Sequence, residues 1–227
     1  MIKQHRDIRH EGINNIYRWP TPQSKTWLIE FLELAQKDNN IMAVIAIGSS
    51  VRPKMVSADL DIIVIFREPA RLKLRPPIEI DARTFIAAEI HNLIAKGNDL
   101  LGWAVKFGRI LFQRENFWAA IMEKWQDRLP LPSAEIATQR AEDAFRRLSN
   151  MFEMGDLDAA HEQALSYVTH LDRAELLRKG IYPASRPELS KQLRAIRCFE
   201  LAALLEQLLD QKNESSKQIS QLVGSRH

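Results

Sequence analysis

Residues 41–50 read IMAVIAIGSS, and residues 58–66 read ADLDIIVIF. Apolar, β-branched runs of this length are typical of buried strands, and the first run ends at Gly48, a residue suited to a tight turn. Asp59 and Asp61 stand at the start of the second run. Because side chains alternate faces along a strand, we expect both carboxylates on one face, with Cα atoms about 6.6 Å apart. The stretch therefore predicts two buried strands with a turn and two acids at one end.

The acidic pair suits a divalent cation. Two carboxylates about 5 Å apart in a partly buried site repel by about 3 kcal/mol at an effective dielectric near 20. Bound Mg²⁺ removes this penalty, because hard cations combine protein carboxylates with substrate phosphates. The neighbouring turn adds phosphate-binding groups, since Gly48 allows close backbone approach and Ser49 and Ser50 carry hydroxyl and N–H donors. The alternative is structural, with Asp59 and Asp61 capping a turn before an ordinary strand.

The spacing of these residues resembles that of a known family. Gly48-Ser49 is followed, after a nine-residue spacer, by Asp-Leu-Asp at residues 59–61. This pattern is similar to the motif of the DNA polymerase β-like nucleotidyltransferases, especially the small prokaryotic members and the antibiotic nucleotidyltransferases. That family carries a third acid on a neighbouring strand, and Asp81 in the segment IEIDA at residues 78–82 matches it better than Glu79, which is the alternative. The resemblance covers about the first half of the chain.

The resemblance implies a chemistry as well as a fold. It implies Mg²⁺-dependent transfer of a nucleoside monophosphate, AMP in the expected case, from an NTP to an acceptor hydroxyl, with release of pyrophosphate. Asp59, Asp61 and Asp81 are the implied catalytic residues and the implied ligands of two Mg²⁺ ions. ATP is the expected co-substrate, and the acceptor is a small molecule, a tRNA or a protein.

The turn after the first strand is the expected phosphate-binding element. By the same resemblance, Gly48, Ser49 and Ser50 line the triphosphate, and Arg52 follows closely enough to neutralise the leaving pyrophosphate. Arg52 and Lys54 are equally compatible with a pair of solvated surface cations.

Two other classes of function are compatible with the sequence. One is a catalytically silent nucleotide-binding module that retains the acids as a metal site. The other is a dimerisation protein whose helical bundle is the working surface, and a homodimer is compatible with the enzyme as well. The presence of all three acids favours the enzyme over the silent module.

The expected fold class is α/β (α+β), with a small mixed-sheet nucleotidyltransferase domain followed by an antiparallel helical bundle. A Leu-Pro-Leu-Pro segment at residues 129–132 separates the predicted catalytic domain, residues 1–129, from the predicted bundle, residues 133–227. Strands are expected over residues 41–47, 62–66, 78–85 and 109–113. Capping residues and glycines divide the bundle into helices over about residues 133–154, 156–179 and 185–209. Their short connections predict antiparallel packing.

Composition limits the compartment and the partners. The chain has 227 residues, 45% of them apolar, and a formal net charge of +3. It can therefore bury a core, and its mild basicity is compatible with nucleotides or RNA. The single cysteine, Cys198, excludes an internal disulfide, and the N-terminus lacks the apolar run of a signal peptide. With no run long enough to span a bilayer, we expect a cytoplasmic protein without a membrane partner.

Overall fold

The computed structural model describes residues 12–52, 59–210 and 223. The chain divides into two compact units, Met1–Pro130 and Leu131–His227. A four-stranded mixed sheet lies in the N-terminal unit, and four helices follow in the described part of the C-terminal unit. This arrangement confirms the expected α+β class.

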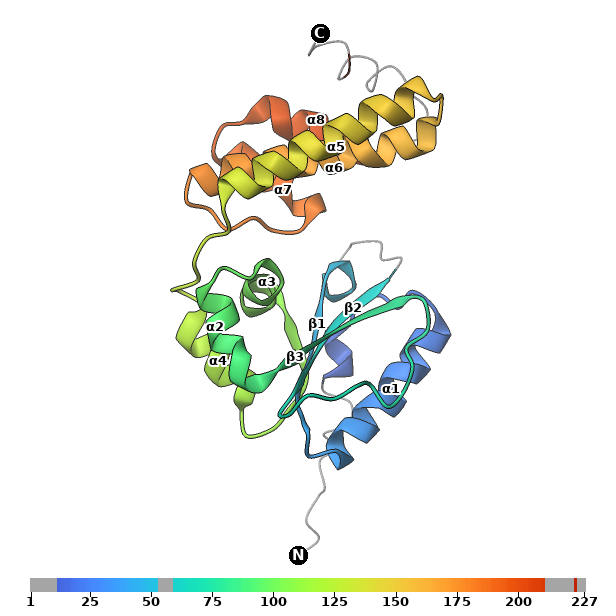
Figure 1. Ribbon diagram of the computed structural model, residues 1–227, viewed down its shortest axis with the longest axis vertical. Helices are drawn as coiled ribbons and strands as arrows, with labels where there is room; N and C mark the ends of the chain where they lie inside the picture. Colours follow the sequence, from blue (N-terminus) through green and yellow to red (C-terminus); the bar gives the residue numbers. More distant parts are fainter. Residues whose placement is uncertain (1–11, 53–58, 211–222, 224–227) are drawn as a thin grey trace, which may run out of the picture. The chain divides into compact units, whose positions relative to one another are not determined.

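The sheet of the N-terminal unit has the strand order β3-β2-β1-β4 (Figure 1). Its strands are β1 (Ile41–Ile47), β2 (Leu60–Phe66), β3 (Ile80–Ile86) and β4 (Arg109–Gln113). β1 runs antiparallel to β2 and β4, whereas β2 and β3 run parallel. The two central strands carry the long apolar runs and are buried almost throughout, while the outer strand β3 is partly exposed. The sequence pattern thus selects which strands occupy the centre.

Helix α1 (Pro22–Lys37) begins at a reciprocal cap. The Thr21 hydroxyl accepts from the Ser24 N–H, and the Ser24 hydroxyl accepts from the Thr21 N–H, each at 3.1 Å. A proline at the first helical position fits this start, because its missing N–H would have no partner inside the helix. Trp27 and Phe31 stack with ring centroids 5.0 Å apart and belong to the core between α1 and the sheet.

The other face of the sheet is covered by three shorter helices (Figure 1). They are α2 (Ile90–Ala95), α3 (Asp99–Phe107) and α4 (Phe117–Trp125). Alternation along β2 divides its side chains between two cores, as the pleat of a strand requires. Ile62 and Val64 pack in the core on the α1 side. Ile63 and Ile65 pack in the core on the side of α2, α3 and α4.

The strand predicted over residues 78–85 begins two residues later than expected. The Pro77 carbonyl accepts from the Ile80 N–H at 3.0 Å, and this turn delays the start of β3. Glu79 therefore lies in the turn, whereas Asp81 is the second residue of the strand. Glu79, the alternative third acid, therefore lies outside the strand on which it was expected.

The C-terminal unit is built on a pair of long helices. Its helices are α5 (Ala134–Glu153), α6 (Leu157–Arg178), α7 (Arg186–Ala195) and α8 (Phe199–Leu209). α5 and α6 run antiparallel, since Thr138 bonds to Arg178 and Phe145 contacts Tyr167. Alanines at the contact, among them Ala141 and Ala144 on α5, are fully buried and permit close packing of the two helices.

The helix predicted over residues 185–209 is broken in two. α7 ends where Arg197 takes a left-handed conformation, φ +64°. The Cys198 N–H then bonds to the Leu193 carbonyl and the Arg197 N–H to the Arg194 carbonyl, which is the Schellman pattern of helix ends. Glycine normally occupies this left-handed position, and an arginine there explains why the sequence pattern did not predict the break.

Length alone would allow one of these helices to cross a membrane. α6 has 22 residues, about what a bilayer requires. Charged residues recur along it, and within residues 12–52 and 59–210 we find no helix that is both long and apolar enough for a membrane span.

Candidate active site

A glycine turn at the end of β1 meets the acid at the start of β2. Gly48 adopts φ +80° and ψ −159°, a combination open essentially to glycine. A Cβ added to Gly48 would lie closer than 3.0 Å to Oδ2 of Asp61, too close for any real side chain. The Asp61 carboxylate therefore lies directly against the glycine, and a side chain at residue 48 would displace it.

The serines of this turn differ in their roles. Ser49–Val51 forms a single 3-10 turn. The Ser50 side chain is buried, and its Oγ donates to the Ile47 carbonyl at 3.3 Å. The Ser50 carbonyl accepts from the Tyr17 N–H at 2.9 Å. Ser50 thus anchors the turn from inside, while Ser49, which is half-buried, is the serine whose hydroxyl lies nearer the surface.

Strand register brings the predicted acids to one edge of the fold. Asp61 pairs with Ile47 on β1 and with Asp81 on β3. Neighbouring strands are about 4.8 Å apart, and paired residues of a sheet point to the same face. Asp59 lies immediately before β2 and is exposed. The three predicted acids therefore belong to one region, at the end of the sheet where β1 stops and β2 and β3 begin.

Burial and like charge act together on the central acid. Burial, and after it the negative charges of Asp59 and Asp81, together raise the pKa of Asp61 to about 6. Arg83 opposes the shift as a nearby positive charge. The protein thus holds a carboxylate where its charged form is disfavoured, a condition common at functional sites.

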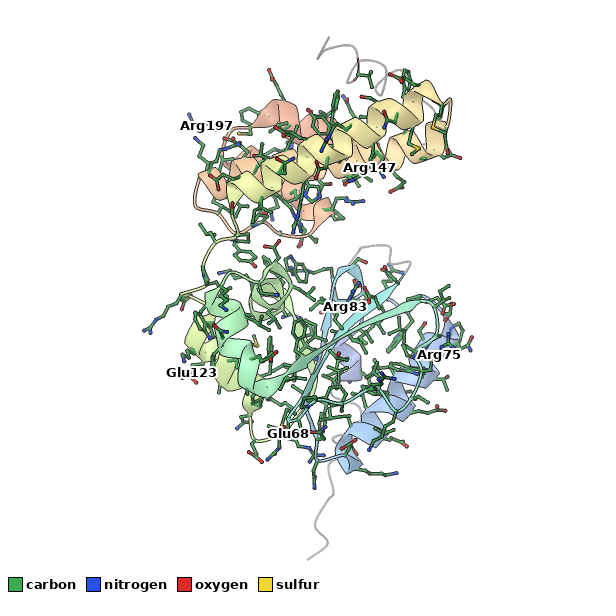
Figure 2. All side chains as sticks on the ribbon, in the orientation of Figure 1. Glu68, Arg75, Arg83, Glu123, Arg147 and Arg197 are labelled. Atoms are coloured by element: carbon green, nitrogen blue, oxygen red, sulfur yellow. The ribbon has the colours of Figure 1, made fainter. Side chains whose placement is uncertain are left out.

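Arg83, a cation beside these acids, was not predicted from the sequence. Its Nη2 and Nε donate to Oδ2 of Asp81 at 2.8 and 3.1 Å, and the carboxylate raises the pKa of Arg83. Both side chains are substantially exposed, and Arg83, labelled in Figure 2, pairs with Ile63, two residues along β2 from Asp61. The two residues are two apart on one strand, a spacing that puts them on the same face. That spacing is the signal from which the pair could have been predicted.

Arg52, the predicted phosphate-binding cation, contacts an aromatic pair on α3. Its guanidinium carbon lies 5.5 Å from the ring centroid of Trp103 and 4.8 Å from that of Phe107. The two rings are themselves in contact, with centroids 5.0 Å apart. Distances of this kind correspond to cation–π interactions. The contact fixes Arg52 beside α3, just after the glycine turn.

The donor chemistry of the site fits Mg²⁺, although the carboxylates are not gathered around one point. No group of three or more His, Cys, Asp or Glu side chains is close enough to hold a metal ion within the described part of the chain. The Asp61 carboxylate lies against Gly48, an arrangement that we call the Gly48 cradle, and its pKa is raised. Among the other acids, Asp59 raises this pKa most. Asp81 instead binds Arg83. Carboxylate oxygens are the donors that Mg²⁺ takes in proteins, so Asp59 and Asp61 have the right chemistry to hold one, while Asp81 is engaged by Arg83.

Comparison with known proteins adds little to this geometry. Among solved structures, the chain is similar to a nucleotidyltransferase-like protein from Exiguobacterium sibiricum 255-15, with 19% sequence identity and a TM-score of 0.37. The match covers 89% of this chain and 75% of that one. No protein-family model matches the sequence, and neither does any curated protein. A similarity this distant carries no argument, so the function has to be argued from the site itself.

Proposed function

We propose that the N-terminal unit is a Mg²⁺-dependent nucleotidyltransferase that moves a nucleoside monophosphate, with ATP as the expected donor, to an acceptor hydroxyl. The observation that best supports the proposal is the placement of the Asp61 carboxylate against the Gly48 turn. Two further acids, Asp59 and Asp81, raise its pKa. This is a poor arrangement for stability and a good one for a site that binds cations and phosphates.

Each residue has a distinct role in the proposal. Asp59 and Asp61 would hold one Mg²⁺ through their carboxylate oxygens, and Asp81, once separated from Arg83, would hold a second. Gly48 lets the triphosphate approach the backbone, and Ser49 donates a hydrogen bond to a phosphate oxygen.

The reaction exchanges one phosphorus–oxygen bond for another. The acceptor oxygen bonds to the α-phosphorus, the bond from that phosphorus to the bridging oxygen of the β-phosphate breaks, and pyrophosphate leaves. The hydroxyl proton passes to Asp81, which Arg83 holds in place until substrate arrives. Bound Mg²⁺ would supply charge neutralisation and a more acidic acceptor hydroxyl. In this proposal Arg83, whose positive charge already acts on Asp61, stabilises the negative charge of the departing pyrophosphate, and Arg52, which follows the glycine turn, is the second candidate for that role.

Pyrophosphate release tests the proposal directly. The full-length protein is mixed with Mg²⁺, each of the four NTPs and a cell extract as the source of acceptor. We expect release with the wild type, its loss in Asp61→Asn, and no loss in Glu68→Gln. Glu68 follows the opposite end of β2 (Figure 2), about 20 Å along the strand from the acids, and so serves as a matched control. Equal release by wild type and Asp61→Asn would overturn the proposal.

The class of acceptor follows from the labelled product. With α-labelled ATP, label that RNase removes indicates a tRNA acceptor, and label that protease removes indicates a protein. Label resistant to both indicates a small molecule.

One observation favours a second candidate, the nucleotide-binding module without turnover. Arg83 holds the acid that would act as the base. If this pair persists when nucleotide and Mg²⁺ are bound, nucleotide binds without pyrophosphate release. Binding of ATP measured in the absence of any turnover would favour this candidate over the enzyme.

A further inference from the structure

The strands at the two edges of the sheet, β3 and β4, have different neighbours. The segment before α1 lies against β4, because Nδ2 of Asn15 donates to the Ile110 carbonyl at 3.3 Å. In the same segment, Gly12 lies too close to the Leu111 carbonyl for any added side chain. The pairing of β4 with β1 is irregular as well. A covered and irregular edge is poorly suited to bind a further strand.

β3 is the open edge of the sheet. It pairs with β2 residue for residue over its whole length, and β2 is the only strand that pairs with it in the part of the chain that the structure describes. Asp81, Arg83 and Thr84 on β3 are exposed. A regular, exposed edge strand offers its outward N–H and C=O groups to a strand of another chain.

Hydrogen bonding shows which residues of β3 face outward. The Leu60 N–H donates to the Glu79 carbonyl at 2.8 Å, so residue 79 faces β2. Backbone groups alternate between the two sides of a strand, so residues 81, 83 and 85 also face β2, whereas Ala82 and Thr84 face away from it. Within residues 12–52 and 59–210 we find no hydrogen bond that uses these outward groups.

The charged side chains of β3 are placed symmetrically about Ala82, with Asp81 before it and Arg83 after it. Consider β3 of a second copy, antiparallel and related by a two-fold axis at Ala82. The two Ala82 residues then form a hydrogen-bonded pair, and Asp81 lies opposite the partner's Arg83. Residues next to such a pair are about 4.5 Å apart at Cα, and opposite charges at this separation attract.

The same charges disfavour other registers of this pairing. Since only the outward residues can bond across the contact, a change of register moves one strand by two residues. Movement in one direction sets Arg83 opposite the partner's Arg83, and movement in the other sets Asp81 opposite the partner's Asp81. Like charges directly opposite each other are destabilising. Attraction and repulsion therefore both select the two-fold axis at Ala82.

An exposed apolar residue fits this arrangement as well. Ile78, in the turn before β3, is 98% exposed. It lies four residues before Ala82, and in an antiparallel pair this position is level with the one four residues after Ala82, the partner's Ile86. Ile86 is itself only half-buried. Contact between the two would remove apolar surface of both from water.

We propose that β3 binds β3 of a second copy of this chain, antiparallel and about a two-fold axis at Ala82. The two sheets then continue into one another, and each Asp81 lies between its own Arg83 and the partner's Arg83. The second copy thereby contributes a cation beside the acids. This inference goes beyond the proposed function and does not rest on it, because the contact needs neither nucleotide nor metal.

Sedimentation of the full-length protein over a range of concentrations tests the proposal. We expect an equilibrium between monomer and dimer for the wild type. Arg83→Asp should weaken dimerisation at least about tenfold, because both cross-strand pairs become like-charged. Exchanging the two charges, with Asp81→Arg and Arg83→Asp together, should restore dimerisation to near the wild-type level. A wild type that stays monomeric, or a folded exchange variant that dimerises no better than Arg83→Asp, would overturn the proposal.

Thr84→Pro tests the backbone pairing separately from the charges. It removes an outward N–H that would donate to the partner's Ile80 carbonyl, and it leaves the bonds between β2 and β3 intact. Dimerisation should be lost while circular dichroism stays that of the wild type. Arg194→Asp makes the same change of charge at an exposed ion pair of the other unit and should leave dimerisation unchanged. A dimer that survives Thr84→Pro, or is weakened equally by Arg194→Asp, would overturn the proposal.

Discussion

The acidic site of the N-terminal unit and the surroundings of His170 on α6 in the C-terminal unit are opposite in charge. In the first, burial and two neighbouring acids raise the pKa of Asp61 to about 6. In the second, burial and four arginines, Arg140 on α5 among them, lower the pKa of His170 to about 4. Each group is held where its charged form is disfavoured. A neutral imidazole avoids this cost by itself, whereas a carboxylate beside two other acids is better suited to binding a cation than to stability.

Ordinary ion pairs of the same molecule show the contrast. Nζ of Lys73 lies 2.8 Å from Oδ2 of Asp38, and this bond lowers the pKa of Asp38. Arg194 likewise lowers the pKa of Glu206. In both pairs the partner favours the charged form. The direction of the pKa shift therefore separates carboxylates whose charged form a partner stabilises from carboxylates whose charged form the surroundings disfavour.

The largest expected effect is on catalysis. We expect Asp61→Asn to reduce pyrophosphate release at least about a thousandfold, because it removes the central metal ligand. The folded protein releases the Asp61 proton at higher pH than the unfolded chain, so wild-type stability falls as pH rises from about 4 to about 6. Denaturation at several pH values should show this fall in the wild type and a smaller one in the variant. Glu68→Gln should alter neither rate nor pH dependence.

Asp172 is a buried acid without a proposed ligand role, and it allows the cost of burying a carboxylate to be measured apart from any metal site. Neither of its oxygens has a hydrogen-bond partner among the described residues, and its pKa is raised from 3.8 to about 8 by burial. Stability should therefore fall as pH rises from about 4 to about 8. We expect Asp172→Asn to stabilise the protein at pH 7 by about 3 kcal/mol. The exposed α6 variant Glu162→Gln is the control, and equal denaturation midpoints for Asp172→Asn and wild type would contradict the account.

A substitution of Gly48 tests whether the close contact between this glycine and the Asp61 carboxylate matters for activity. We expect Gly48→Ala to destabilise the protein by about 2 kcal/mol and to lower pyrophosphate release, because the new methyl group displaces the carboxylate. Gly97→Ala is a matched control, since Gly97 has a similar φ of +77° but nothing within 4 Å of an added Cβ. It should show the backbone strain and no loss of activity. Equal activity losses in both variants would exclude a specific role for the cradle.

The smallest effect concerns Arg83. Its pair with Asp81 is exposed, so Arg83→Gln should change the free energy of unfolding by less than about 1 kcal/mol. Because Arg83 lowers the pKa of Asp61, its removal should raise that pKa and strengthen Mg²⁺ binding a few-fold in calorimetry. Arg194→Gln breaks an exposed pair in the other unit and should leave Mg²⁺ binding unchanged. Weaker Mg²⁺ binding by Arg83→Gln would show that Arg83 does not compete with the metal.

Local sequence signals predicted much of the fold and part of the site. Apolar runs located β1 and β2, capping residues and glycines located α5 and α6, and the Gly48 turn with Asp61 lies where the motif indicated. These features depend on neighbours within a few residues. Patterns of this range can be recognised without knowing the tertiary structure.

Features that depend on tertiary structure could not be predicted in the same way. The effect of Arg140 on α5 upon the pKa of His170 on α6 follows from the register of two antiparallel helices, which periodicity does not specify. The break at Arg197 depends on a left-handed arginine where a glycine is usual. The burial of Asp172 likewise could not be predicted, because apolar and charged residues alternate irregularly along α6.

The most direct test of the central claim is the pKa of the Asp61 carboxyl group, measured by carbon NMR with and without Mg²⁺. Without metal, the account predicts a pKa of about 6. With saturating Mg²⁺, it predicts a pKa below the ordinary value of 3.8, because a bound cation favours the carboxylate. The same pKa in both conditions would contradict a cation site at Asp61 and, with it, the proposed nucleotidyltransferase.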